Sequence, residues 1–302
     1  MKNNNDLSQL HQQMMGQIDN EINAEMAENI AENQSETMQT QGLCGCDLES
    51  MKAAGLDTSK LAEIQQQLDA DAEQEYLEMD QFMSQTSANS FADEALNPDA
   101  NFLPEGATLL TPSWSKVYSD TLDNNPLVNS GDIDNQAVVG GGNCKNIWNW
   151  AKGGGWGCTG GRASNTQIAT WAFWYKPNRS KFYSIRPRFE FNGFYIAKAD
   201  DKWYNCKNAQ VKVSAQTNVY QYNWKGLSSV DLVNINRNNV NLNKRLDDTR
   251  YTNYTALLGK DDWALVVCKV KLYVRAQGGG SYAKADFAAG ANKVCVPHVI
   301  IS

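Results

Sequence analysis

Aromatic side chains alternate with basic ones in two stretches of this sequence. Residues 140–161 read GGGNCKNIWNWAKGGGWGCTGG, and residues 171–183 read WAFWYKPNRSKFY. Aromatic rings offer flat apolar faces and Lys and Arg attract anions, so together they suit an acidic sugar, an anionic membrane or single-stranded nucleic acid. A plainer interpretation places some of the rings in the core of a β-sandwich. We expect the ligand contacts to come from eight residues: Trp148, Trp150, Trp156, Trp174, Tyr175, Lys176, Arg179 and Lys181.

The glycine clusters and cysteines of residues 140–161 suggest two other interpretations. A phosphate-binding loop ends in Gly-Lys-Ser/Thr and lies between a strand and a helix, and this stretch does neither. Cys144 and Cys158 flank the glycine-rich loop fourteen positions apart (158 − 144 = 14). A disulfide between them would stabilise the fold by about 3 kcal/mol through loop closure, so this pair is the disulfide candidate. Cys268 and Cys295 fall in strand patterns, where buried free thiols are common.

Evidence for catalysis in the sequence is thin. The chain has 2 His, of which His11 lies in a polar segment. Cys295 and His298 are three positions apart on an expected strand, which would point them to opposite faces. Cys44 and Cys46 lack the further ligands that a zinc site needs. We therefore predict no catalytic residue, no metal site and no cofactor, and we rank an Asp-dependent hydrolase below non-catalytic functions.

Charge divides the sequence into two unlike halves. Residues 1–100 hold 3 Lys and 20 Asp or Glu (3 − 20 = −17), whereas residues 101–302 hold 24 Lys or Arg and 14 acids (24 − 14 = +10). Of the 30 aromatic residues, only Tyr76, Phe82 and Phe91 lie before residue 100. Such asymmetry indicates an interaction role for at least one half, and the two charges are complementary.

The acidic half contains two segments with apolar residues at helical spacing, 6–34 and 58–84. Two such helices alone bury too little surface to fold stably. We expect them to be partly disordered, to dock on the basic half as a helical hairpin, or to pair between copies of the chain. The chain therefore divides into an acidic amphipathic-helical region (1–84), a linker of small and polar residues (85–112) and a basic, aromatic-rich domain (113–302).

From about residue 165 the sequence alternates apolar and polar residues with a period of two, as half-buried β-strands do. In residues 263–277 (WALVVCKVKLYVRAQ) the even positions from Ala264 to Val274 are predicted to face inward. Asn192-Gly193 is typical of a hairpin turn between two strands. Because no amphipathic helix interrupts these strands, we predict a mainly antiparallel β-sandwich of jelly-roll type.

These features favour a non-catalytic binding protein whose basic, aromatic sandwich engages an anionic surface, either an acidic glycan or a membrane. A lectin or the attachment part of a toxin would work in this way, and the acidic region would mask or target that surface. The alternative is a structural subunit of a particle, fibre or surface layer. Expected partners are an anionic glycan or lipid, the chain's own acidic region and a second copy of the chain, with nucleic acid ranked below them.

The sequence leaves the compartment open. Residues 1–17 lack the apolar core of a secretory signal, and the sequence has no run of about 20 apolar residues that would span a membrane. We therefore expect either a cytoplasmic protein or export by a signal-independent route.

Overall fold

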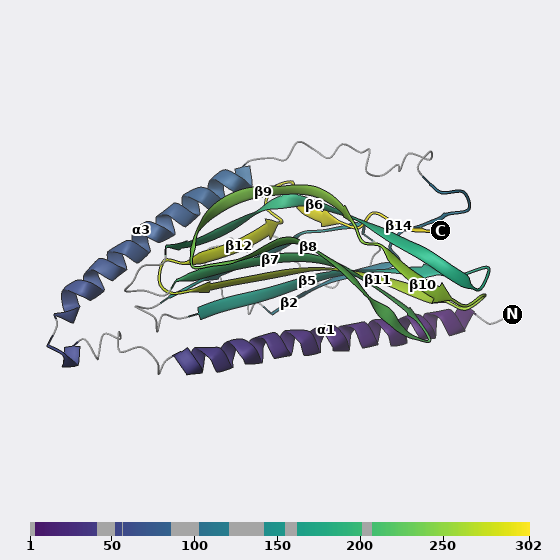
Figure 1. Ribbon diagram of the computed structural model, residues 1–302, viewed down its shortest axis with the longest axis horizontal. Helices are drawn as coiled ribbons and strands as arrows, with labels where there is room; N and C mark the ends of the chain where they lie inside the picture. The colour runs from purple at the N-terminus through teal and green to yellow at the C-terminus, as the bar shows by residue number, and fades with distance from the viewer. Residues whose placement is uncertain are drawn as a thin grey trace.

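Two antiparallel β-sheets pack face to face, and a long helix lies on the outer face of each sheet (Figure 1). This computed structural model describes residues 4–40, 52–55, 57–85, 103–120, 142–154, 162–200 and 207–302. The order of layers is therefore helix, sheet, sheet, helix. None of the described helices is long and apolar enough to cross a membrane.

The first sheet has five strands, and every neighbouring pair is antiparallel. Its order across the sheet is β2 (Trp114–Ser119), β5 (Arg162–Tyr175), β11 (Ala264–Gln277), β7 (Asn208–Gln221) and β8 (Asn223–Arg237). The central strand β11 pairs along its full length with β5 on one side and along most of it with β7 on the other.

The second sheet is built around one strand, β6 (Lys181–Asp200). One edge of β6 pairs with two strands in succession, β9 (Asn239–Tyr251) and β10 (Tyr254–Leu258). The other edge pairs with three short strands, β12 (Tyr282–Phe287), β13 (Lys293–Cys295) and β14 (Val299–Ile301). An outermost row pairs with those three strands and consists of β4 (Ile147–Lys152), β3 (Cys144–Lys145) and β1 (Thr108–Leu110).

The chain alternates between the sheets in the manner of a jelly roll. From β4 to β7 each successive strand lies in the other sheet, β7 and β8 form a hairpin within the first sheet, and the alternation resumes through β9, β11 and β12. The predicted antiparallel β-sandwich is confirmed. Strand β1 lies within residues 85–112, so the sheet takes in part of the segment assigned to the linker.

The main core lies between the two sheets and is filled by the inward positions of each strand. In β11 the predicted inward residues, from Ala264 through Cys268 to Val274, are all fully buried. Leu265 and Val267 are buried as well, although they face outward, because a helix covers that end of the strand. The simple alternation of β11 therefore breaks down where the outer face has a partner.

Both predicted helices are present. Helix α1 (Asn4–Thr40) packs Met14, Ile18 and Ile22 onto the outer face of the first sheet. Helix α3 (Thr58–Gln85) packs Tyr76 and Met83 onto the outer face of the second sheet. Figure 1 shows α1 below the sandwich and α3 above one end of it.

The Asn192-Gly193 dipeptide is not a turn, and this prediction is wrong. Strand β6 runs straight through it, and Gly193 pairs with Leu246 of β9. A Cβ on Gly193 would lie 2.3 Å from the ring of Phe287 and 2.4 Å from the carbonyl oxygen of Asp286. Glycine is required here because the neighbouring strand approaches closely, which is a recognised reason for glycine inside a strand.

The disulfide candidate also needs correction, because Cys144 is bonded to Cys295. The two residues are register partners in β3 and β13, so pairing of these strands brings the sulfurs together. Cys158 lies outside the described residues. The bond closes a loop with a sequence separation of 151, worth about 5 kcal/mol in the chain-entropy model. Cys268 is a buried free thiol as expected, and burial raises its pKa.

Candidate binding site at one end of the sandwich

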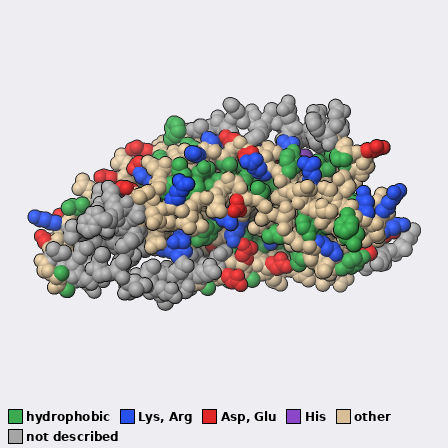
Figure 2. All heavy atoms as spheres, viewed as in Figure 1, with side chains coloured by type: hydrophobic (Ala, Val, Ile, Leu, Met, Phe, Trp, Pro, Cys, Tyr) green, Lys and Arg blue, Asp and Glu red, His purple; other side chains and the backbone are tan. Residues whose placement is uncertain are grey.

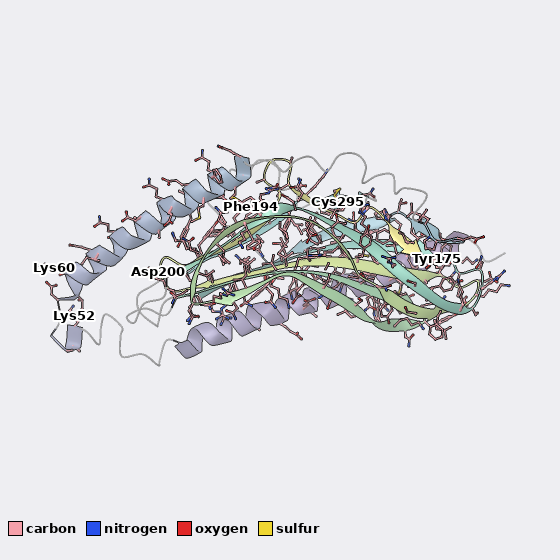
Figure 3. The ribbon with its side chains drawn as sticks, turned by 45° about the horizontal axis from the view of Figure 1, so that its top comes forward. Lys52, Lys60, Tyr175, Phe194, Asp200 and Cys295 are labelled. Carbon is pink, nitrogen blue, oxygen red and sulfur yellow. A yellow bond between two sulfur atoms is a disulfide. The ribbon has the colours of Figure 1, made fainter. Side chains whose placement is uncertain are left out.

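The eight predicted contact residues do not form one site. Trp148 and Trp150 lie on β4, where Trp150 is aligned through β12 with Ile196 of β6. The predicted residues from Trp174 to Lys181 lie at the other end of β6. Fifteen strand residues (196 − 181 = 15) separate these positions, roughly 40–50 Å. Tyr175 and Asp200 are labelled at these opposite ends of the sandwich (Figure 3), and Trp156 lies outside the described residues.

Trp148 and Trp150 lie on the edge strand of the second sheet, where their backbone groups are hydrogen-bonded. The free edge of β4 is closed by side chains of β5, because Gln167 accepts a hydrogen bond from the Trp148 backbone N–H (2.7 Å) and Asn165 donates one to the Trp150 carbonyl. The Trp150 ring lies 6.3 Å from Tyr282, within the cluster that α3 covers. Closing an edge strand in this way prevents it from pairing with another chain.

Trp174 and Tyr175 are half-buried and mark the approach to the opposite end. The Trp174 indole N–H donates to His11 Nδ1 (2.9 Å), and its ring meets Trp263 edge-on at 6.3 Å. Tyr175 packs edge-on against Tyr183 at 5.5 Å, and burial raises its pKa to about 12. Both rings are therefore engaged in packing.

Three connections meet at this end of the sandwich, which we call the tip and define as residues 176–182, 221–227 and 257–263. Hydrogen bonds tie them together. The Asp261 N–H donates to the Pro177 carbonyl (2.8 Å), and the Lys260 N–H donates to Ser180 Oγ (2.9 Å). The Gln221 amide donates to the carbonyls of residues 259 and 262 and accepts from the Gly259 N–H. These bonds hold the three connections in one arrangement.

Large apolar side chains project into solvent from this tied scaffold. Phe182 is 68% exposed and lies opposite Leu257 in the β6–β10 register, which is itself 54% exposed. Tyr222 is 67% and Leu227 57% exposed in the β7–β8 hairpin. Figure 2 shows hydrophobic and basic side chains together at the right-hand end. Clustered exposed apolar side chains rimmed by polar groups mark interaction sites.

Tyr222 is held in a backbone conformation that side chains rarely adopt. Its φ is 66°, in the left-handed region, where a bulky residue is a true outlier. The Tyr222 hydroxyl donates to Asp262 Oδ2, and this hydrogen bond raises the pKa of Tyr222. Backbone strain of this kind is concentrated at ligand-binding positions.

The tip is basic. It holds Lys176, Arg179, Lys181, Lys225 and Lys260 against Asp261 and Asp262, a balance of 5 − 2 = +3. Among the described residues neither Lys176, Arg179 nor Lys181 has an ion-pair partner. Instead the ammonium groups of Lys176 and Lys181 lie over the rings of Trp263 and Tyr183, at 5.8 and 4.7 Å from the centroids.

Sequence reasoning found three of the five cations of the tip but missed most of its exposed apolar residues. The period-two alternation continues without a break from Ala209 to Trp224, which indicates a single strand, whereas the chain turns at Tyr222. The signal was the Asn-Trp-Lys-Gly that follows, since Asn and Gly mark turns. Leu257 carries no such signal, because its exposure depends on the position of the short strand β10 at the edge of the second sheet. No group of three His, Cys, Asp or Glu in the described part of the chain is arranged to hold a metal ion.

Comparison with known proteins identifies no family for this chain. No protein-family model and no curated protein matches it. Among solved structures, the module TmCBM61 in complex with β-1,4-galactotriose is 10% identical, over 58% of this chain and 86% of its own, with a TM-score of 0.19. The enzymatically active domain of bacteriophage CBA120 tailspike protein 4 is 7% identical, over 65% of this chain and 19% of its own, with a TM-score of 0.17. Scores this low carry no inference about fold or ligand.

Proposed function

We propose that this protein is a non-catalytic carbohydrate-binding protein that binds an acidic glycan through the tip of its β-sandwich. The observation that carries the proposal is the exposure of Phe182 and Tyr222 beside cations that have no ion-pair partner in the described chain. Jelly-roll sandwiches occur in lectins, but fold alone does not set function, so the proposal depends on this site.

Aromatic rings and cations at the tip match the two chemical features of an acidic sugar. A pyranose ring has an apolar face that packs on an aromatic side chain, and its carboxylate or sulfate pairs with Lys or Arg. The hydrogen bond from Tyr222 to Asp262 fixes the tyrosine ring before the ligand arrives. Such pre-organisation reduces the entropy lost on binding.

Polar groups among the rings favour a glycan over a lipid bilayer. Asp261 and Asp262 lie within the tip, where insertion into a bilayer would strip water from their carboxylates. The same carboxylates can accept hydrogen bonds from sugar hydroxyls. The exposed amides of Asn178 and Asn223 add both donors and acceptors beside the rings.

The test is calorimetric titration with polygalacturonate oligomers, heparin and neutral β-1,4-galactan. We expect binding to one of the acidic glycans, with affinity that falls as salt rises. Tyr222→Ala or Phe182→Ala should weaken binding about tenfold, in line with the loss of one aromatic contact. A combined Lys176→Ala, Arg179→Ala and Lys181→Ala variant should weaken it further. Lys244→Ala, an exposed cation on β9, is the matched control and should bind like the wild type.

Two outcomes would overturn the proposal. One is the absence of binding to every glycan tested. The other is sedimentation with phosphatidylserine vesicles, but not phosphatidylcholine vesicles, that is lost in the triple variant while glycans remain unbound. That result would assign the tip to an anionic membrane.

A further inference from the structure

The outer face of the first sheet is also aromatic and basic, but α1 covers it. Its floor is apolar, with Ile168, Leu265 and Val267 packed against Met14, Ile18 and Ile22 of the helix. Around this floor lie larger polar-edged side chains. We call this surface the covered face and define it by Trp114, Lys116, Tyr118, Trp174, Trp224 and Lys271.

Five hydrogen bonds between the described residues cross this interface, and each has its donor on the covered face and its acceptor on α1. The sheet supplies ammonium, phenol and indole donors, and the helix supplies carboxylates and one imidazole nitrogen. The pairs are Lys116 and Tyr118 with Asp19 (2.8 and 2.5 Å), Lys271 with Glu25 (2.5 Å), Trp224 with Glu21 (2.9 Å) and Trp174 with His11 (2.9 Å). A surface that offers only donors here suits an anionic ligand.

The covered face and the tip are continuous. Trp174 lies under α1 and meets Trp263 of the tip edge-on at 6.3 Å. Trp224 belongs to both surfaces, because it lies two residues after Tyr222 in the tip and its indole N–H donates to Glu21 of α1. A ligand chain bound at the tip would therefore reach the first ring of the covered face without crossing an apolar gap, if α1 were not in place.

Helix α1 contains a destabilising glycine that its packing against the sheet does not require. Gly16 lies within the segment that contacts the sheet, yet it faces solvent and a Cβ there would meet nothing within 4 Å. Glycine in a helix interior is destabilising relative to alanine, because it loses more backbone freedom on folding. The sequence thus lowers the stability of the cover at a position where alanine would fit.

We propose that the covered face is the second part of the glycan site and that α1 is an internal competitor for it. Asp19, Glu21 and Glu25 take the places that the acidic groups of a bound glycan chain would occupy. This inference rests on the proposed function, because it assigns the same class of ligand to an extension of the same surface. A ligand that gains contacts only after α1 leaves is bound more weakly by the fraction of open molecules.

The experiment loosens or tightens α1 without changing the covered face. Ile18→Asp places a charge on the apolar floor and should release the helix, and Gln17→Asp adds the same charge on the solvent side as the matched control. Release is read without ligand from the fluorescence of Trp174 and Trp224, which should shift to longer wavelength. With full-length Ile18→Asp, affinity for the acidic glycan that the wild type binds should rise at least tenfold. Gly16→Ala should lower it by up to about fivefold, the equivalent of about 1 kcal/mol.

Second-site variants separate this proposal from the proposed function. In the Ile18→Asp background, Lys116→Ala and Lys271→Ala should each remove most of the gain while tip binding remains. If the wild type binds glycan and Ile18→Asp shows the fluorescence shift without any gain in affinity, α1 is a structural layer and the inference fails. If no variant binds any glycan, the proposed function fails instead. Should Ile18→Asp aggregate, an unchanged affinity in Gly16→Ala, with α1 more protected from proteolysis, would overturn the inference.

Discussion

The tip and the covered face are built from the same types of residue but differ in what satisfies them. At the tip, the cations of residues 176–181 lie over aromatic rings or in solvent, and the large apolar side chains are exposed. On the covered face, Lys116 and Lys271 pair with acids of α1, and the apolar floor is buried by the same helix. The difference shows that an aromatic and basic surface is stable on this sandwich in two ways, with or without acids supplied by the chain itself.

The second sheet extends this comparison, because α3 covers part of its outer face with the same charge arrangement. Lys152, Lys198 and Lys284 pair with Glu73, Glu75 and Asp80 of the helix. Each of these five ion pairs between described residues joins an acid of a helix to a lysine of the sandwich. The docking of the acidic region as a mask stays a proposal.

The largest expected effect is the release of α3 from the second sheet, which tests whether the docking of α3 and ligand binding at the tip are independent. Tyr76 stacks on Tyr282 at 4.5 Å and donates its hydroxyl hydrogen to the Gly280 carbonyl. Tyr76→Ala should weaken the docking of α3 by about 3–5 kcal/mol, the range for removing a buried aromatic side chain. Hydrogen exchange of residues 58–85 would measure the loss, and Tyr76→Phe, which loses only the hydrogen bond, should cost about 1 kcal/mol. A change in glycan affinity at the tip would show that the two regions are coupled.

Acid should weaken the sandwich through one buried histidine, His298. Burial, with help from the Arg188 charge, lowers the pKa of His298 to about 4, whereas an unfolded His titrates near pH 6.5. The unfolded chain therefore binds a proton first, so stability is lost as the pH falls from 6.5 toward 4, by on the order of 2 kcal/mol.

Urea denaturation across this pH range would measure the loss. Burial raises the pKa of Glu190, which acts in the opposite direction as the pH falls. His298→Gln isolates the histidine contribution. An unchanged pH dependence in this variant would contradict the assignment.

Salt should weaken the docking of α1 on the covered face more than it weakens the apolar core between the sheets. The Lys116–Asp19 and Lys271–Glu25 pairs are partly exposed, so each contributes about 0.5 kcal/mol and is screened by salt. Raising sodium chloride roughly tenfold, from about 0.05 to about 0.5 M, should screen both ion pairs. The docking free energy of α1 should then fall by about 1 kcal/mol in total. The rate of proteolysis within α1 would measure this loss of docking free energy. The Asp19→Asn and Glu25→Gln double variant, which lacks both ion pairs, is the control and should be insensitive to salt.

The smallest effect concerns Tyr222 and sharpens the distinction between stability and binding at the tip. Asn adopts the left-handed conformation more readily than Tyr, so Tyr222→Asn should relieve backbone strain. We expect the melting temperature to rise by roughly 2 °C while glycan affinity falls about tenfold. A fall in melting temperature would mean that the hydrogen bond to Asp262 outweighs the strain, and that Tyr222 is a structural residue.

The parts of the fold that depend on local pattern were predictable from the sequence. Period-two alternation in β11 and helical spacing in α1 and α3 each report on one element and its nearest neighbour, and all three elements form as expected. These patterns persist because each strand or helix must bury one face whatever lies opposite.

Apart from the turn at Tyr222, the features that sequence reasoning missed depend on a partner far away in the chain. Gly193 resembles a turn until the approach of Phe287 is known, and Cys144 finds Cys295 only because β3 and β13 align. The candidate site divided for the same reason. Trp150 and Lys181 both belong to stretches in which aromatic and basic residues alternate, but they lie far apart along the length of β6. Composition suggested aromatic and basic contacts, and only strand register places those residues in the fold.

The pairing of α1 with the first sheet has a consequence for the order of synthesis. Glu25 and its partner Lys271 are 246 residues apart, and the floor residues Leu265 and Val267 are slightly more distant from Ile18 (265 − 18 = 247 and 267 − 18 = 249). At about 5–20 residues per second, roughly 12–50 s of translation separates the helix from its sheet. During that time α1 has no surface to cover. We expect its acidic, glutamine-rich composition to keep this segment hydrated through the delay, so that the acids that later pair with the lysines also oppose aggregation of the unfinished chain.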